Sequence, residues 1–210
     1  MAKLSKEEYL KLVAQETSRM SQPGSFYGRV LKKKNEESKD KAYLPVHNYF
    51  LYNFPLQDIW ECRTMTEQGF EKWHKLRLGE IAKVISDNYL FRTEYNPTIL
   101  GAKLIDTFMH QFMKYPQCRS VYEWLHLPLD RTALNSIPKL KDICGIDGDL
   151  EELFDLSEKY KRCPYGLAPD DYMEIQKYLL IVKEIFGLTA RVELNAILWA
   201  GETKGKKGKK

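Results

Sequence analysis

The stretch Asn96–Asp130, NPTILGAKLIDTFMHQFMKYPQCRSVYEWLHLPLD, decides how the rest of the chain is interpreted. It opens with an Asn-Pro turn pair, and from Gly101 onward apolar residues recur at helical spacing, which predicts a buried helix. The apolar stripe of this helix consists of Leu104, Ile105, Phe108, Met109, Phe112 and Met113. Lys103 is then expected in the first turn, where unpaired backbone N–H groups form a site for an anion.

Three polar residues, Lys103, Asp106 and His110, are expected to lie off this apolar stripe. A lysine in a first helical turn is commonly a solvated residue or the ion-pair partner of a neighbour such as Asp106. A lysine in such a place can also act as a nucleophile. The spacing leaves both interpretations of Lys103 open.

Asp130 stands at the other end of the stretch, directly before a helical pattern that runs to about Leu140. In this position its carboxylate is expected to cap the helix by accepting a backbone N–H. A carboxylate held at a helix entrance is also well placed to meet positive charge that develops in a reaction. We interpret Lys103 and Asp130 as one reaction centre, in which capping and chemistry do not exclude each other.

GAKLIDTFMH followed by LPLDRTAL resembles the helix-hairpin-helix DNA glycosylase superfamily, in which a hairpin ending in Gly-x-Lys opens a helix and a Pro-Val-Asp segment follows. The resemblance implies that Lys103 attacks the sugar and that Asp130 assists. It also implies that Gly101 belongs to a hairpin that contacts DNA. Ile99 stands where the first hairpin glycine is usual.

Two further departures from the family pattern concern the Asp130 side of the motif. Leu129 stands where Val is usual, and the interval from lysine to aspartate is longer than in common members. An extension such as Tyr115–Trp124 is therefore expected to loop out.

Near the end of the chain, VELNAILWAG is similar to the closing helix of archaeal 8-oxoguanine glycosylases, where an Asp and, four residues on, a Trp line the base pocket. The resemblance implies a base pocket lined by Asn195, at the Asp position, and by Trp199. An amide both donates and accepts hydrogen bonds whereas a carboxylate only accepts, so the base edge that is read can differ. 8-Oxoguanine is the first expected substrate, and other modified bases, including those of viral DNA, stay open.

These resemblances imply an all-α fold with a helix-hairpin-helix glycosylase-like core and a cleft between two helical lobes. We expect one helical domain over residues 1–200, with two lobes as the alternative, and a basic disordered tail over residues 201–210. The implied activity is excision of a base from double-stranded DNA, with lyase activity through a Schiff base on Lys103, by a monomer. The alternative is a non-catalytic helical module that binds nucleic acid or protein, in which Lys103 contacts phosphate and Asp130 is only a cap.

Composition gives weaker indications. The net charge of +4 over 210 residues is mildly basic and is not by itself typical of nucleic-acid binding. The four cysteines are widely separated, so we expect no metal site, no disulfide and no cofactor. A charged N-terminal segment and the lack of a membrane-length apolar run predict an intracellular protein, cytoplasmic or nuclear, with no membrane partner.

Several local expectations concern the N-terminal half. Ser5 and Glu8 have capping-box spacing for a helix to about Met20. The lysine run Lys32, Lys33 and Lys34 is either a phosphate contact or a solvated face. The aromatic stretch 43–60 is expected to place most of its rings in the core. A helix is predicted from Thr66 to about Ser86, and of the histidines, His74 and His110 are the candidates for acid–base work, with a structural role as the alternative.

Two local expectations concern the C-terminal half. Asp149 is expected to cap a helix. Asp171 and Glu174 are expected to form a capping box for a helix that runs through Phe186 and ends at Gly187.

Overall fold

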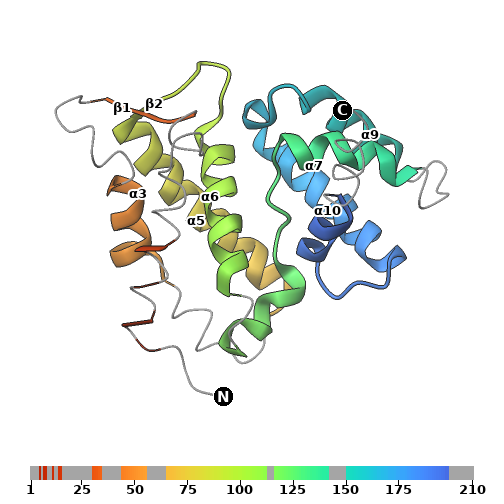
Figure 1. The fold of residues 1–210 in the computed structure, drawn as a ribbon, viewed down its shortest axis with the longest axis horizontal. Coiled ribbons are helices and arrows are strands. Elements are labelled where there is room, and N and C mark those ends of the chain that lie inside the picture. The colour runs from red at the N-terminus through yellow and green to blue at the C-terminus, as the bar shows by residue number, and fades with distance from the viewer. Residues whose placement is uncertain are drawn as a thin grey trace, which may run out of the picture. The chain divides into compact units, whose positions relative to one another are not determined.

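The computed structural model describes residues 5, 7–8, 11, 14–15, 30–34, 44–55, 65–112, 116–141 and 150–198, with the backbone alone at 33, 111–112 and 116–119. These residues are mostly helical (Figure 1), which confirms the all-α prediction. The chain divides into two compact units, Met1–Val121 and Tyr122–Lys210. The predicted glycosylase-like core and the predicted cleft stay predictions.

The longest helix of the first unit is α5, Glu67–Asn88. It begins where the sequence predicts, because the Thr66 hydroxyl oxygen accepts the backbone N–H of Gly69 at 3.1 Å and caps the helix. Seven of its residues are buried, among them Phe70 and Ile81. The predicted amphipathic helix is thereby confirmed.

The second long helix, α6, spans Pro97–Phe112 and therefore begins earlier than predicted. Asn96 acts as its cap, with proline in the first helical position, where the missing N–H is not needed. Asn96 accepts three backbone N–H groups at 2.9 to 3.1 Å, those of Thr98, Ile99 and Leu100. Every N–H group of this first turn is therefore already hydrogen-bonded. The prediction of an anion-binding site at the start of this helix is wrong.

Gly101 lies within α6, where it allows the helix to approach α5 closely. A Cβ atom added to Gly101 would lie 2.4 Å from the Cγ2 of Ile81. Real Cβ atoms do not come so near another carbon, so only glycine fits without a shift of the helices. The prediction that Gly101 opens the helix is wrong, and its role in the fold is helix–helix packing.

A third helical segment packs against α5 in the first unit. It begins as α3, Leu44–Asn48, and continues as a π-helix, η2, Tyr49–Asn53. The backbone N–H of Phe54 donates to the carbonyl of Tyr49 at 2.9 Å, five residues back, as a π-helix requires. Phe50 then stacks on Phe108 of α6, with ring centroids 4.1 Å apart.

The aromatic rings of this segment behave largely as predicted. Tyr49, Phe50 and Phe54 are buried in the first unit, whereas Tyr52 is 75% exposed. The expectation that most of these rings belong to the core is confirmed for the residues described.

Two other elements of the N-terminal half can be compared with prediction. A two-residue strand β1, Lys32–Lys33, pairs antiparallel with β2, Tyr89–Leu90. The Ser5 N–H donates to a carboxylate oxygen of Glu8 at 2.7 Å, and the Glu8 N–H donates to the Ser5 hydroxyl at 3.2 Å. The predicted capping box is confirmed, while most of its helix lies outside the described residues.

The second unit consists of short helices around a longer one, α10, Pro169–Ile185. The other helical elements in the described residues from 116 onward include η3 Pro116–Trp124, α7 Arg131–Ser136, η4 Ile137–Lys139, α9 Glu151–Tyr160, η5 Pro164–Gly166, η6 Arg191–Glu193 and a last helical segment at 194–198. The stretch predicted to loop out is therefore largely a 3₁₀ helix, η3. The N-cap residue of α9 is Leu150, and Asp149 lies outside the described residues.

The two ends of α10 test the capping predictions. The predicted capping box is wrong, because α10 starts at Pro169 and Asp171 lies in its first turn. The Asp171 carboxylate accepts the hydroxyl of Tyr160 at 2.6 Å and the ammonium of Lys159 at 3.0 Å, which ties α10 to α9.

The predicted end of α10 is confirmed. Gly187 has a φ of 62°, and its N–H donates to the carbonyl of Glu184 at 3.0 Å. The N–H of Leu188 donates to the carbonyl of Lys183 at 3.0 Å, which completes a Schellman motif.

Candidate functional site

Asp130 is the N-cap of α7, as predicted. One of its carboxylate oxygens accepts the backbone N–H of Ala133 at 2.9 Å, and its own carbonyl accepts the N–H of Leu134 at 2.9 Å. The side chain is half-buried. The carboxylate is therefore held in one orientation at the positive end of a helix, where negative charge is stabilised.

The extended segment that leads to Asp130 is clamped by Gln176, a buried residue of α10. The Gln176 side-chain oxygen accepts the N–H of Leu127 at 3.0 Å, and its side-chain nitrogen donates to the Leu127 carbonyl at 2.8 Å. A single carboxamide thus satisfies both backbone groups of a buried residue, as a neighbouring β-strand would. These two hydrogen bonds hold the Leu-Pro-Leu segment before Asp130 against α10.

Arg191, which is 1% exposed, strengthens the same clamp. Its guanidinium donates to the carbonyl of Trp124 at 2.6 Å and to the backbone carbonyl of Gln176 at 3.1 Å. A buried arginine is tolerated only when its N–H groups find acceptors. Arg191 therefore links the start of the approach segment to α10.

His126, within the approach segment, forms a further link. Its Nδ1 lies 2.9 Å from the hydroxyl of Tyr172 on α10, and both side chains are buried. Which of the two donates depends on the histidine tautomer. Sequence reasoning singled out none of the side chains that hold this segment, because the chain separates them by tens of residues.

Lys103 lies on α6 in the first unit and is half-buried. It follows the first turn of the helix rather than belonging to it, because α6 begins at Pro97. Since Lys103 and Asp130 belong to different units, their predicted convergence stays a prediction.

Asp106 lies off the apolar stripe by its position in the sequence, yet its side chain is buried. It is 4% exposed, and its Oδ1 lies 2.8 Å from Nε2 of His74 on α5, which is 1% exposed. A buried carboxylate requires a hydrogen-bonding partner, and His74 supplies one. The contacts of His74 therefore support a structural role rather than acid–base work.

The two residues predicted to contact DNA through a hairpin lie inside the first unit. Ile99 is 1% exposed and Gly101 is buried. The structure offers no exposed side chain at either position, and DNA contact through their backbone stays a prediction.

The lysine run is partly described. Lys32 and Lys34 are exposed, and the side chain of Lys33 lies outside the described residues. The Lys34 ammonium donates to the carbonyl of Ser86 at 2.6 Å, near the C-terminal end of α5. A cation at this end interacts favourably with the helix dipole.

The predicted base pocket is described only at Asn195. This residue is half-buried in the helical segment 194–198, whereas Trp199 and the tail 201–210 lie outside the described residues. Glu193, two residues earlier, accepts the hydroxyl of Tyr122. Burial and the neighbouring carboxylate together raise the pKa of Tyr122 to about 12, so this phenol stays protonated at neutral pH.

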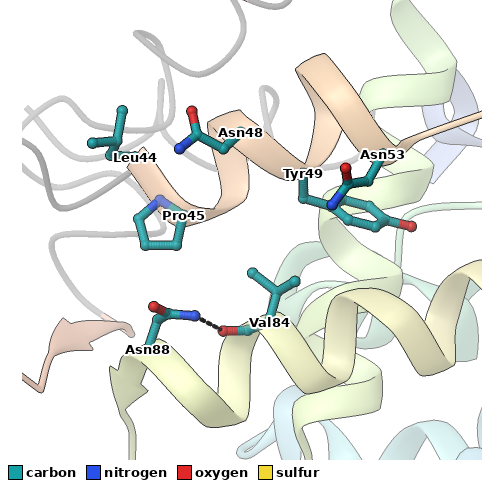
Figure 2. A pocket seen from close by; sticks show the side chains of 7 residues that line it. All are labelled: Leu44, Pro45, Asn48, Tyr49, Asn53, Val84 and Asn88. Carbon is teal, nitrogen blue, oxygen red and sulfur yellow. Dashed lines mark hydrogen bonds between the residues drawn. The ribbon is translucent and has the colours of Figure 1, made fainter.

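A pocket that sequence reasoning missed lies in the first unit, between α3, η2 and the last two turns of α5 (Figure 2). Its cavity volume is about 300 Å³. The described residues that line it are Leu44, Pro45, Asn48, Tyr49, Asn53, Val84 and Asn88. Asn88 is 35 residues from Asn53 along the chain, so the sequence gave no local signal that the three carboxamides share a pocket.

No family model, curated protein or solved structure matches this chain. Among the described residues, no helix is both long and apolar enough to cross a membrane. The geometry of the candidate site and the resemblances of its motifs are therefore the basis for assigning a function.

Proposed function

We propose that this protein is a DNA glycosylase that flips a damaged or modified base out of the duplex and cleaves its N-glycosidic bond. The observation that supports the proposal best is the fixed geometry of Asp130. Its carboxylate is oriented by the Ala133 N–H, and its approach is clamped by Gln176. A preorganised carboxylate stabilises positive charge on the sugar as the glycosidic bond breaks.

In this proposal Lys103 attacks the anomeric carbon of the flipped nucleoside. The bond from that carbon to the base breaks and the base leaves with the bonding electrons, protonated by solvent. The lysine nitrogen then loses a proton, the bond from the anomeric carbon to the sugar ring oxygen breaks, and that oxygen takes up a proton as the protonated Schiff base forms. The Schiff base permits strand scission by elimination of the 3′ phosphate. Asn195 and Trp199 are the proposed base-pocket residues, and the substrate class is modified purines or pyrimidines, with 8-oxoguanine first.

Asp130→Asn is the variant that separates the proposal from its alternative. Asparagine caps a helix about as well as aspartate does, so stability should change by roughly 0.5 kcal/mol or less. Loss of the charge should lower base release by roughly a hundredfold or more, measured on a panel of duplexes with single modified bases. Retained base release at the original rate, on a substrate that the unchanged protein processes, would contradict the role of Asp130.

Lys103→Gln tests the nucleophile separately. Borohydride reduces the Schiff base to a covalent protein–DNA adduct, which denaturing electrophoresis detects. We expect the adduct to disappear in Lys103→Gln and to persist in Lys139→Gln, a matched control at an exposed lysine. An undiminished adduct in the folded Lys103 variant would exclude this lysine.

The alternative is a non-catalytic helical module that binds nucleic acid or protein. The burial of Ile99 and Gly101 favours it, since both then serve the fold. If no modified duplex in the panel releases a base, while duplex DNA binds equally to the unchanged protein and to Asp130→Asn, the alternative holds.

A further inference from the structure

The pocket between α3, η2 and α5 combines three exposed carboxamide side chains with the apolar side chains of Leu44, Pro45 and Val84. Figure 2 shows Pro45 and Asn48 on the α3 segment and Val84 and Asn88 on α5, with the Pro45 ring turned toward α5. Of the described residues that line it, none is charged. A pocket of this composition suits an uncharged, planar group with hydrogen-bonding edges rather than an ion.

Asn48 and Asn53 both line the pocket because of the π-helix between them. In this helix the carbonyl of Tyr49 accepts the N–H of Phe54, five residues on, so each turn takes up more residues than an α-helix does. π-Turns of this kind are frequent at functional sites. Asn48 makes no capping hydrogen bond at the start of η2, and its side chain is exposed.

Asn88 supplies the third carboxamide, from the opposite wall. Its side-chain nitrogen donates to the carbonyl of Val84 at 2.8 Å, which fixes the orientation of the amide (Figure 2). The carboxamide oxygen takes no part in that bond. Adjacent donors and acceptors on asparagine match the edges of nucleobases, as in its paired hydrogen bonds to adenine.

One lysine, Lys34, lies next to the end of α5 that carries Asn88. The Lys34 backbone N–H donates to the Asn88 carbonyl at 3.1 Å, and the Lys34 ammonium is exposed near the end of α5. Lys32 is exposed two residues earlier. An ammonium is a common point contact for phosphate, and Lys34 retains two further N–H donors beyond the one that Ser86 accepts.

We propose that this pocket binds one nucleotide, with the base between Pro45 and Val84, its edge on the asparagine carboxamides and its phosphate near Lys34. The nucleotide is either free or part of a single strand of DNA. The site is distinct from the proposed glycosylase centre, since its residues lie in α3, η2 and α5 and at Lys34, directly after β1, whereas Lys103 lies on α6 and Asp130 caps α7. Failure of one proposal therefore leaves the other standing.

Isothermal titration of the full chain tests the proposal, with the four deoxynucleoside monophosphates, the matching deoxynucleosides and inorganic phosphate as probes. We expect at least one monophosphate and its nucleoside to bind, and Asn48→Leu to raise both dissociation constants about tenfold. Asn135→Leu, at an exposed asparagine of α7, is the matched control and should bind as the unchanged protein does. Lys34→Ala should weaken the monophosphate and leave the nucleoside unchanged.

Tyr52 distinguishes the two sources of the nucleotide. It is 75% exposed and precedes Asn53 in the chain, so a neighbouring base of a strand can stack on it. Weaker binding of a short single-stranded oligonucleotide by Tyr52→Ala, with unchanged binding of the monophosphate, identifies a strand. Equal effects on both identify a free nucleotide.

Three results would overturn the proposal. The first is no binding of any monophosphate to the unchanged protein. The second is equal binding by Asn48→Leu and Asn135→Leu, with the fold of both verified by circular dichroism. The third is displacement of a bound monophosphate by inorganic phosphate but not by its nucleoside.

Discussion

The two residues proposed for the reaction centre are positioned by different physical means. The helix that carries Lys103 is held by apolar packing, in which Gly101 brings α6 against Ile81 of α5. The approach to Asp130 is held by buried hydrogen bonds from Gln176 and Arg191. Apolar packing depends on shape and tolerates small adjustments of side chains. When one partner of a buried hydrogen bond is removed, the other is left unsatisfied and the full desolvation penalty is lost from the stability.

The largest effect is therefore expected from Gln176→Leu. This change leaves the N–H and the carbonyl of Leu127 buried without their partner, which should lower the free energy of unfolding by about 3 kcal/mol. Urea unfolding measures the loss. Gln68→Leu, at an exposed glutamine of α5, is the control and should change stability by about 0.5 kcal/mol or less. If both variants unfold alike, the clamp is not what fixes this segment.

The apolar side of the comparison is tested by two glycines on neighbouring helices. Gly101→Ala places a Cβ atom against Ile81 and should destabilise the first unit by about 2 kcal/mol. Gly79→Ala, on α5, meets nothing within 4 Å and should stabilise it by roughly 0.5–1 kcal/mol. Thermal unfolding should show shifts of opposite sign. Shifts of the same sign would mean that the close approach of α5 and α6 is not the reason for Gly101.

The smallest effect concerns an exposed polar contact of the second unit. Hydrogen bonds from Tyr160 and Lys159 lower the pKa of Asp171 below its ordinary value of 3.8. A lowered pKa in the folded state adds stability above pH 3.8, and that stability is lost as the pH falls through the lowered value. Asp171→Asn should therefore be less stable at neutral pH by roughly 1 kcal/mol or less.

The same reasoning predicts that this difference vanishes in strong acid, where Asp171 is protonated in both states. Unfolding of both proteins across the acidic range measures it. A difference that stays constant down to the most acidic pH would show that the Asp171 charge does not contribute. Buried pairs such as His74 and Asp106 should be far more sensitive to substitution than this one.

The sequence predicted those parts of the fold that depend on neighbours along the chain. The helix predicted from Thr66 begins there, Asp130 caps α7 as its spacing indicates, and Gly187 ends α10 with a positive φ. Each of these signals lies within a few residues of the structure that it predicts. Caps and helical stripes can be recognised for that reason.

The errors have equally physical causes. Asn96-Pro97 was read as a turn before the helix, although Asn is a good cap and Pro a good first helical residue. Gly101 was read as a hairpin residue, because a glycine that admits another helix looks no different in sequence from one that makes a turn. The sequence offered Asp106 as a partner for Lys103, and its contact with His74 could not be foreseen because His74 belongs to another helix.

The candidate sites were predicted only in part. The cap role of Asp130 followed from local spacing, but Gln176 and Arg191 reach the approach segment from 49 and 67 residues away along the chain. The carboxamides of the pocket come from two separate helical segments. Contacts of this kind form only when distant segments of the unit come together in the fold, so no local sequence pattern reveals them.

The π-helix at Tyr49–Asn53 has one further consequence. Its single extra residue lets Phe54 remain beneath Trp73, with ring centroids 5.5 Å apart, while Asn53 faces the pocket. Removing one residue here would turn all that follows by about 100°, the angle between successive residues in an α-helix. A chain without this residue could keep Phe54 in its aromatic core or Asn53 at the pocket, but not both.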